Sequence, residues 1–260
     1  MKSVNKIVSI LQKKYGVGMV DVAIVVGSGQ AEAVPNLENV VRVPYEKLGL
    51  PKSKVPGHSG SFVFGEYNGK KVVLVSRIHF YEHGKTEYVR VPFEIVSKLG
   101  ASRVFLLTST GGVNKSFKVG DVMIIKDHIN FSGVNPMVGM ENTRFVDMHN
   151  CYDKVVVEQI KGVAAKKKLD LREGVFCQMS GPCYETNAEI EMLRVVGGDV
   201  VSMSTAHDCI ICNYLGMKVA GLAIVVNVYD DNNSNVSHEE VLANAKLACS
   251  KIKSILEEII

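Results

Sequence analysis

The chain has 260 residues, of which 47% are hydrophobic and 22% are charged, and its formal net charge is +3. This composition is ordinary for a soluble globular protein with a core of normal size. Because the net charge is small and the basic residues are scattered, no nucleic-acid partner is expected. No uncharged run approaches the ~18 residues of a membrane span, so no membrane association is expected either.

The first element predicted along the chain is a helix near the N-terminus. Val4, Ile7, Val8 and Leu11 recur at the spacing that places them on one helix face. Lysines lie on the other face and no small-residue cleavage site follows, so the segment is interpreted as a structural helix and not as a targeting signal. With no signal peptide, the six cysteines are interpreted as free thiols of a cytoplasmic protein.

Short runs rich in β-branched residues then alternate with helical patterns. The predicted strands cover residues 21–26, 71–76, 103–108, 121–126, 174–179 and 218–226. The predicted helices cover residues 88–99, 154–168, 185–196, 205–215 and 237–260. Residues 40–67 carry strand-like pieces with no helical pattern between them, which indicates mixed or antiparallel pairing there. We therefore predict an α/β fold, a single domain over residues 1–260 with a mixed, mostly parallel central sheet flanked by helices.

Ligands of such sheets gather beyond the carboxyl ends of the strands, so the residues after each apolar run are the candidate site. After residues 71–76 come Arg77, His79 and Tyr81, which would share one face if the backbone stayed extended. Two potential cations and a phenol on one face suit an anion with a hydroxylated group attached. Ser28, between two glycines, would add backbone N–H groups and a hydroxyl, although a tight turn with no ligand is an equal alternative.

Two further strand ends carry small or aromatic polar residues. Ser109 begins a Ser-Thr-Gly-Gly stretch that favours exposed N–H donors, with a plain loop as the alternative. Tyr184 beside Glu185 could stack on a flat heterocycle and accept hydrogen bonds from its N–H edge. The alternative for Glu185 is a place in the first turn of a helix, where a carboxylate complements the helix dipole.

The last strand ends add a hydroxyl and an amide. Ser204 is predicted to cap a helix, whose N-terminus is also a ready anion site. Met203 beside it is either core packing or a ligand contact. Asn227 offers both a donor and an acceptor to one edge of a base. The acidic and amide residues after Asn227 do not form a calcium-loop pattern and are interpreted as a solvated loop, and His58 and His238 are surface histidines by default.

Cys209 and Cys212 form a Cys-x-x-Cys pair. A zinc site normally needs two more ligands at matching spacing, and the sequence contains no second pair of this kind. On a helix the two residues would share one face, so two small buried apolar side chains are the preferred interpretation. No metal site is expected.

In this order along the chain, the strand ends resemble those of the purine nucleoside phosphorylases of the trimeric, low-molecular-mass branch. The matching segments are Gly27-Ser-Gly29, Val55-Pro-Gly-His-Ser-Gly60, Arg77-x-His-x-Tyr-Glu82, Gly111-Gly-Val-Asn114, Gly181-Pro-Cys-Tyr-Glu-Thr186, Val201-Ser-Met-Ser-Thr205, Asn227 and His238-Glu-Glu-Val241. The resemblance implies phosphorolysis, in which a purine ribonucleoside and inorganic phosphate give the free base and ribose 1-phosphate in purine salvage. It also implies a homotrimer that uses no cofactor, with phosphate as a co-substrate.

The resemblance further implies a role for each matching residue. Phosphate would be held by Ser28, His58, Arg77, His79, Ser204 and the backbone N–H of Ser109. The ribose would be lined by Tyr81, Met203 and His238, and the base by Tyr184, Glu185 and Asn227. Catalytic contributions would come from Asn227, Glu185 and His79, with Glu82 orienting His79.

The chain departs from the family pattern at two positions, where Thr108 replaces the usual Asn and Val226 replaces the usual Thr. Phe145 is the nearest counterpart of the aromatic side chain that a neighbouring subunit contributes in the family. Because the carboxylate of Glu185 suits the N1–H of a 6-oxopurine and would repel the bare N1 of adenine, inosine and guanosine are the favoured substrates. The alternatives are a methylthioadenosine phosphorylase of the same fold, a nucleoside hydrolase and a non-catalytic nucleoside-binding protein.

Overall fold

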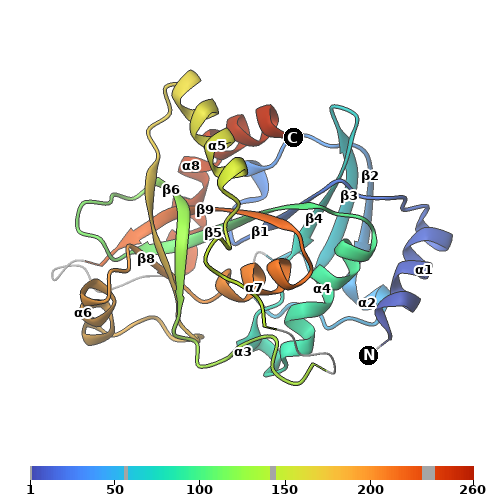
Figure 1. Ribbon diagram of the computed structural model, residues 1–260, viewed down its shortest axis with the longest axis horizontal. Coiled ribbons are helices and arrows are strands. Elements are labelled where there is room, and N and C mark those ends of the chain that lie inside the picture. Colours follow the sequence, from blue (N-terminus) through green and yellow to red (C-terminus); the bar gives the residue numbers. More distant parts are fainter. Residues whose placement is uncertain (1, 56–57, 141–144, 230–237) are drawn as a thin grey trace.

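The structure is a computed structural model that describes residues 2–55, 58–140, 145–229 and 238–260, apart from the side chains of residues 238, 240, 241 and 247. Its centre is a sheet that draws strands from both halves of the chain (Figure 1). The strands are β1 (Val22–Val26), β2 (Glu38–Pro44), β3 (Ser61–Tyr67), β4 (Lys70–Ser76), β5 (Arg103–Gly112), β6 (Val122–Asn130), β7 (Arg172–Gln178), β8 (Val200–Ser202) and β9 (Lys218–Val228). Their order across the sheet is β2-β3-β4-β1-β5-β8-β7-β6-β9.

Helices cover both faces of this sheet. They are α1 (Val4–Tyr15), α2 (Tyr45–Leu48), α3 (Phe80–His83), α4 (Thr86–Lys98), α5 (Lys154–Lys166), α6 (Asn187–Val195), α7 (Ala206–Tyr214) and α8 (His238–Ile259), with a short 3-10 helix η1 (Ala31–Ala33). Helices α1, α4 and α7 pack on one face, and α5 and α8 pack on the other (Figure 1). No helix in the described ranges is long and apolar enough to cross a bilayer.

The first strand shows how one run of apolar residues fills two cores. Ala23 and Val25 join the core beneath α1, α4 and α7, whereas Val22 and Ile24 join the core beneath α5 and α8. Successive side chains of a strand point to opposite faces, so a strand covered on both sides must be apolar throughout. This is why β1 reads as an unbroken apolar run and not as an alternating one.

The predicted α/β fold, with a mixed sheet flanked by helices, is confirmed. The antiparallel pairing expected within residues 40–67 is also present, since β3 pairs antiparallel with both β2 and β4. Strands β5 and β6 run beyond their predicted ends, and the short elements α3 and β8 were not predicted. A three- or four-residue element is too short to show a hydrophobic period in the sequence.

Five of the described strands close into a ring, which the sequence did not predict. β5 pairs with β9, β9 with β6, β6 with β7, β7 with β8, and β8 returns to β5. The edge of β5 opposite β9 pairs with β1 as far as Leu106, and it pairs with β8 only from Gly111. Residues 107–110 therefore have no strand partner along that edge within the described ranges. We call this interval the fork of β5, and the pocket described next opens beside it.

Candidate active site

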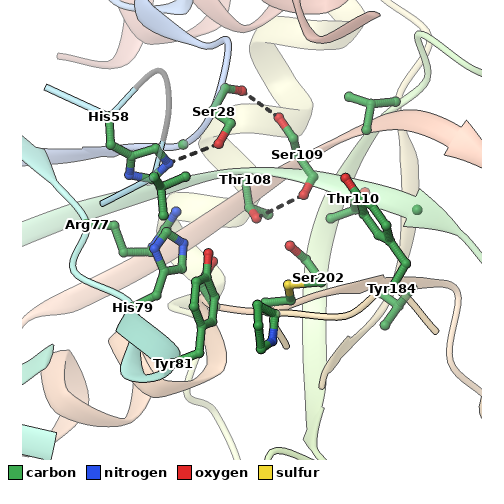
Figure 2. A pocket seen from close by; sticks show the side chains of 18 of the residues that line it. Ser28, His58, Arg77, His79, Tyr81, Thr108, Ser109, Thr110, Tyr184 and Ser202 are labelled. Carbon is green, nitrogen blue, oxygen red and sulfur yellow. Dashed lines mark hydrogen bonds between the residues drawn. The ribbon is translucent and has the colours of Figure 1, made fainter. Parts of the chain in front are cut away.

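A pocket of about 600 Å³ opens beside the fork of β5 (Figure 2). This volume lies within the usual range for small-molecule sites. The walls come from the carboxyl ends of β1, β4, β5, β7 and β9 and from the turn after β8. This is where ligands bind in open α/β sheets, and it is the edge of the sheet that the strand ends indicated.

The pocket brings together all but one of the predicted site residues. Its lining includes Ser28, His58, Arg77, His79, Tyr81, Ser109, Tyr184, Glu185, Met203, Ser204 and Asn227. Thr108 and Val226, the two departures from the family pattern, line it as well. The remaining residue, His238, is the first residue of α8, and its side chain lies outside the described part of the chain.

A buried acid holds Arg77 at one end of the pocket. Arg77 is only 2% exposed, and its Nε donates to Oδ2 of Asp208 over 2.5 Å. Both terminal nitrogens donate to the carbonyl oxygen of Leu107, in the fork of β5, at 3.3 Å. A guanidinium group carries five N–H donors, and these contacts use three of them.

His79 is fixed by its neighbour Glu82. The carboxylate of Glu82 accepts hydrogen bonds from the backbone N–H of His79 at 2.9 Å and pairs with its Nδ1 at 3.0 Å. Burial alone would raise the pKa of Glu82, but hydrogen bonds from His79 and from the backbone N–H of Lys54 lower it to about 2. Burial also lowers the pKa of His79, and the positive charge of Arg77 adds to this effect. The imidazole therefore presents Nε2 to the pocket while Nδ1 stays on Glu82.

The expectation that Tyr81 shares a strand face with Arg77 and His79 was wrong. β4 ends at Ser76, and Tyr81 lies in α3, because His79 and Glu82 form a capping box that starts a helical turn at Phe80. Tyr81 still lines the pocket, and its ring stacks on that of His79 with 4.9 Å between centroids.

His58 and Ser28 complete the same end of the pocket. Nε2 of His58 lies 2.9 Å from Oγ of Ser28, and Oγ of Ser109 donates to the carbonyl oxygen of Ser28 over 2.8 Å. Nδ1 of His58 is buried with no hydrogen-bond partner in the described part of the chain. Burial, followed by the nearby His79 and Arg77, lowers the pKa of His58 to about 3. His58 is therefore neutral near pH 7 as long as no anion offsets its burial and the positive charge of Arg77.

Lowering the pH from 7.5 to 5.5 in phosphate-free buffer is expected to destabilise the folded protein. His58 of the unfolded chain takes up a proton near pH 6.5, whereas the folded protein resists protonation down to about pH 3. The free energy of unfolding therefore falls as the pH drops below 6.5, by at most about 1.4 kcal/mol per pH unit from this histidine. Burial lowers the pKa values of His79 and His207 and acts in the same direction.

Thermal unfolding at the two pH values measures this loss. The variant His58→Asn should lose less stability than the wild type between pH 7.5 and 5.5, because it lacks the contribution of His58. It should still lose some stability, because His79 and His207 contribute as well. Equal losses in the two proteins would show that His58 does not resist protonation in the folded state.

The opposite end of the pocket carries Tyr184, which Figure 2 shows across the cavity from His58, Arg77 and His79. Glu185 and Asn227 also line the pocket, and each holds a buried polar atom, Oε1 and Nδ2, with no hydrogen-bond partner among the described residues. An unpaired buried donor or acceptor costs roughly 1–3 kcal/mol. Such groups are therefore suited to a ligand that supplies one N–H donor and one acceptor.

Glu185 does not lie in the first turn of a helix, so that alternative was wrong. α6 begins at Asn187, its N-cap is Thr186, and Glu189 closes the capping box. The dipole-complementing carboxylate is thus Glu189, and the side chain of Glu185 is left for the pocket. Burial raises the pKa of Glu185.

The prediction that Ser204 caps a helix was also wrong. The N-cap of α7 is Thr205, one residue later, which is fully buried and has a φ of 83°. A positive φ at a β-branched residue is a strained conformation, and strain of this kind concentrates at functional sites. The turn places Met203 and Ser204 in the pocket lining.

Two residues of the site were missed by the sequence. Asp208 carries no local signal, because its partner Arg77 lies 131 residues away. Tyr229 was not singled out, because the acidic and amide residues after Asn227 indicated a solvated loop; β9 extends to Val228, and Tyr229 lines the pocket. The rest of that expected loop, residues 230–233, lies outside the described residues. The alternation that continues past Asn227 was the available signal for Tyr229.

The Cys-x-x-Cys pair has no joint site within the described residues. Cys209 and Cys212 are both buried on α7, as expected of small apolar side chains. Cys209 instead lies beside Cys151 and His128, outside the pocket, where the three potential ligand atoms are within 4.8 Å of one another. All six cysteines are free thiols, and five of them are buried.

The chain matches known proteins over most of its length. The model of the phosphorylase superfamily matches residues 21–260. Purine nucleoside phosphorylase 1 of Geobacillus stearothermophilus is 37% identical over 228 residues, which cover 85% of this chain and 83% of that protein. Two structures of the Schistosoma mansoni purine nucleoside phosphorylase, with adenosine and with inosine, superpose with TM-scores of 0.91 and 0.90. Both are 32% identical and cover 98% of this chain, and this chain covers 95% and 94% of theirs.

Proposed function

This chain belongs to the phosphorylase superfamily and, within it, to the purine nucleoside phosphorylases, and from that premise we propose that it cleaves purine nucleosides with inorganic phosphate. The products are the free base and ribose 1-phosphate, which makes the protein a pentosyltransferase. One observation carries the proposal: the pocket holds anion-binding side chains at one end and the unpaired Glu185 Oε1 and Asn227 Nδ2 at the other. Phosphate and a nucleoside, bound side by side, would satisfy both ends.

The reaction requires no covalent bond between the protein and the substrate. As an oxygen of phosphate bonds to C1′ of the ribose, the bond from C1′ to N9 breaks, and the base leaves with the electron pair. Positive charge develops on the sugar and negative charge on the base. The protein has to hold phosphate beneath C1′ and stabilise the departing base, so no side chain acts as the nucleophile.

We assign the residue roles from the two ends of the pocket. Phosphate is assigned to Ser28, His58, Arg77, His79, Ser204 and the backbone N–H of Ser109. The ribose is assigned to Tyr81, Met203 and His238, and the base to Tyr184, Glu185 and Asn227. Arg77 supports the first assignment, because it is a buried cation and its contacts with Asp208 and Leu107 use three of its five N–H donors. His79 supports it through Nε2, which can accept a hydrogen bond from a protonated phosphate oxygen while Nδ1 donates to Glu82.

The substrates that fit best are 6-oxopurine nucleosides, inosine and guanosine. A carboxylate at Glu185 accepts the N1–H of a 6-oxopurine, whereas adenine presents a bare N1 to it. Similar structures hold adenosine and inosine, so similarity alone does not choose between the two bases. Comparing cleavage of inosine, adenosine and methylthioadenosine at equal concentration separates this proposal from a methylthioadenosine phosphorylase, for which only the last would react.

Release of hypoxanthine from inosine is expected to depend on phosphate. The rate should rise to saturation as phosphate is added and should be close to zero without it, because phosphate itself is the attacking group. Sulfate at equal ionic strength serves as the control, since it fills an anion site without forming the product. Undiminished cleavage in the absence of phosphate would instead indicate a nucleoside hydrolase, and an absence of turnover with phosphate present would indicate a nucleoside-binding protein.

The proposal extends to the oligomeric state, the cofactor requirement and the cellular location of the enzyme. We propose a homotrimer, supported by the fully exposed side chain of Phe145, an aromatic group that a neighbouring subunit could cover. We propose that the reaction uses no cofactor beyond phosphate as a co-substrate. A cytoplasmic location in purine salvage accords with the six free thiols, which persist in reducing compartments.

A further inference from the structure

Tyr229 enters the base end of the pocket, and nothing in the proposed reaction requires it. Its hydroxyl donates to Oε2 of Glu185 over 2.5 Å. Hydrogen bonds to an ionised group are short and about twice as strong as neutral ones. The contact therefore ties Tyr229 to the one carboxylate that is assigned to the base.

Tyr229 is held in this position by its own backbone and by a glycine. Its N–H donates to the carbonyl oxygen of Gly112 at 3.1 Å, and its carbonyl oxygen accepts from Arg194 at 2.7 Å. A Cβ at Gly111 would lie 2.5 Å from Cε2 of the Tyr229 ring, closer than atoms approach. The glycine thus leaves room for the ring against β5, and these contacts hold the phenol in a fixed position in the pocket.

The two oxygens of Glu185 are consequently unequal. Oε2 is occupied by the phenol, whereas Oε1 is buried and has no hydrogen-bond partner among the described residues. An oxygen that already accepts one short hydrogen bond is a weaker acceptor for a second. Only Oε1 is fully available to a ligand.

Hypoxanthine and guanine differ at the edge that faces this carboxylate. Hypoxanthine presents one donor there, N1–H, whereas guanine presents N1–H together with its 2-amino group. A carboxylate with both oxygens free can accept the two donors of guanine as a bidentate pair. A carboxylate with one free oxygen matches hypoxanthine and leaves the 2-amino group of guanine without a full partner.

We propose that Tyr229 sets the base specificity of this enzyme by occupying one oxygen of Glu185, so that inosine is cleaved in preference to guanosine. The proposal rests on the proposed phosphorolysis and narrows its substrate class. Leaving one donor poorly paired in a buried site is expected to lower kcat/KM for guanosine about tenfold relative to inosine. Tyr229 acts here through Glu185 as a positioning residue.

The variant Tyr229→Phe tests this, because it keeps the ring against Gly111 and removes only the hydroxyl. That hydroxyl also lies near Asn227, but a change at Asn227 affects both substrates alike, so the readout is the ratio of the two kcat/KM values. We expect kcat/KM for guanosine to approach that for inosine in the variant. Tyr67→Phe is the matched control, since it removes a phenol that donates to the carbonyl oxygen of Glu257, outside the pocket. The ratio of kcat/KM for guanosine to kcat/KM for inosine in that control should equal the wild-type ratio.

Each outcome decides a different question. An unchanged ratio in an active Tyr229→Phe enzyme, or a wild type that cleaves guanosine as well as inosine, overturns the proposal and leaves phosphorolysis intact. If the wild type cleaves neither nucleoside in the presence of phosphate, the proposed function itself fails. If Tyr229→Phe does not fold, titration calorimetry of the wild type with the two free bases still tests the proposal. Hypoxanthine should bind more tightly than guanine, and equal or reversed affinities would overturn the proposal.

Discussion

Replacing Asn227 by alanine is expected to lower kcat for inosine roughly 100- to 1,000-fold, with much smaller changes in KM for inosine and phosphate. Nδ2 of Asn227 is buried at the base end with no partner among the described residues, so it is poised to donate to N7 of the purine. N7 gains negative charge only as the glycosidic bond breaks. A donor aimed there strengthens in the transition state and acts on turnover more than on binding.

Steady-state kinetics with each substrate varied at saturating levels of the other measures the two effects separately. The control is Asn36→Ala, which makes the same change on the surface, where Oδ1 of Asn36 accepts from Lys253. That variant should match the wild type. A loss carried entirely by KM in Asn227→Ala, with kcat unchanged, would mean that Asn227 binds the base but does not stabilise its departure.

The change Asp208→Asn is expected to destabilise the fold by about 3–5 kcal/mol. Asp208 and Arg77 are 1% and 2% exposed and are joined over 2.5 Å, so the amide would leave a buried guanidinium without its counter-charge. KM for phosphate should rise as well, because Asp208 also fixes the orientation of Arg77 toward the pocket. Both effects follow from a single contact.

Denaturant unfolding of wild type and variant gives the first effect, and phosphate titration of the activity gives the second. Asp147→Asn is the matched control, because Asp147 is an exposed carboxylate paired with His149. Pairs of that kind contribute little, so its unfolding midpoint should stay within about 0.5 kcal/mol of the wild type. Equal midpoints for Asp208→Asn and the wild type would contradict a structural role for the buried pair.

The sequence predicts this pocket well where a side chain follows directly on a strand. Ser28, Arg77 and Asn227 each come at or just after the end of an apolar run, and the carboxyl ends of neighbouring parallel strands must meet at one edge. Position along the chain is then enough to bring them together. The role of each residue came from the resemblance to a family and not from the pattern.

Features that depend on contacts between distant segments could not be predicted in this way. The ring closes through two residue pairs between β5 and β8, which leave no period in the sequence. The pairing of Arg77 with Asp208 is likewise a tertiary contact between a strand end and a helix. The cap of α7 was misplaced by one residue because both Ser204 and Thr205 carry a hydroxyl and serine is the better N-cap of the two, whereas the strained turn puts Thr205 at that position.

Strand β5 also sets the distance between the two ends of the pocket. Leu107 contacts Arg77 at the anion end of the pocket, and Gly111 lies against Tyr229 at the base end. The two contacts are four residues apart along β5, which is about 13 Å of extended strand. Loops could adjust such a distance, but this part of β5 is hydrogen-bonded to β9 on both sides of one register shift between Thr110 and Gly111, so its length is nearly fixed. A compound whose anionic group and base each fit their own end of the pocket, but whose linker is one bond too long, should therefore bind poorly because of its length alone.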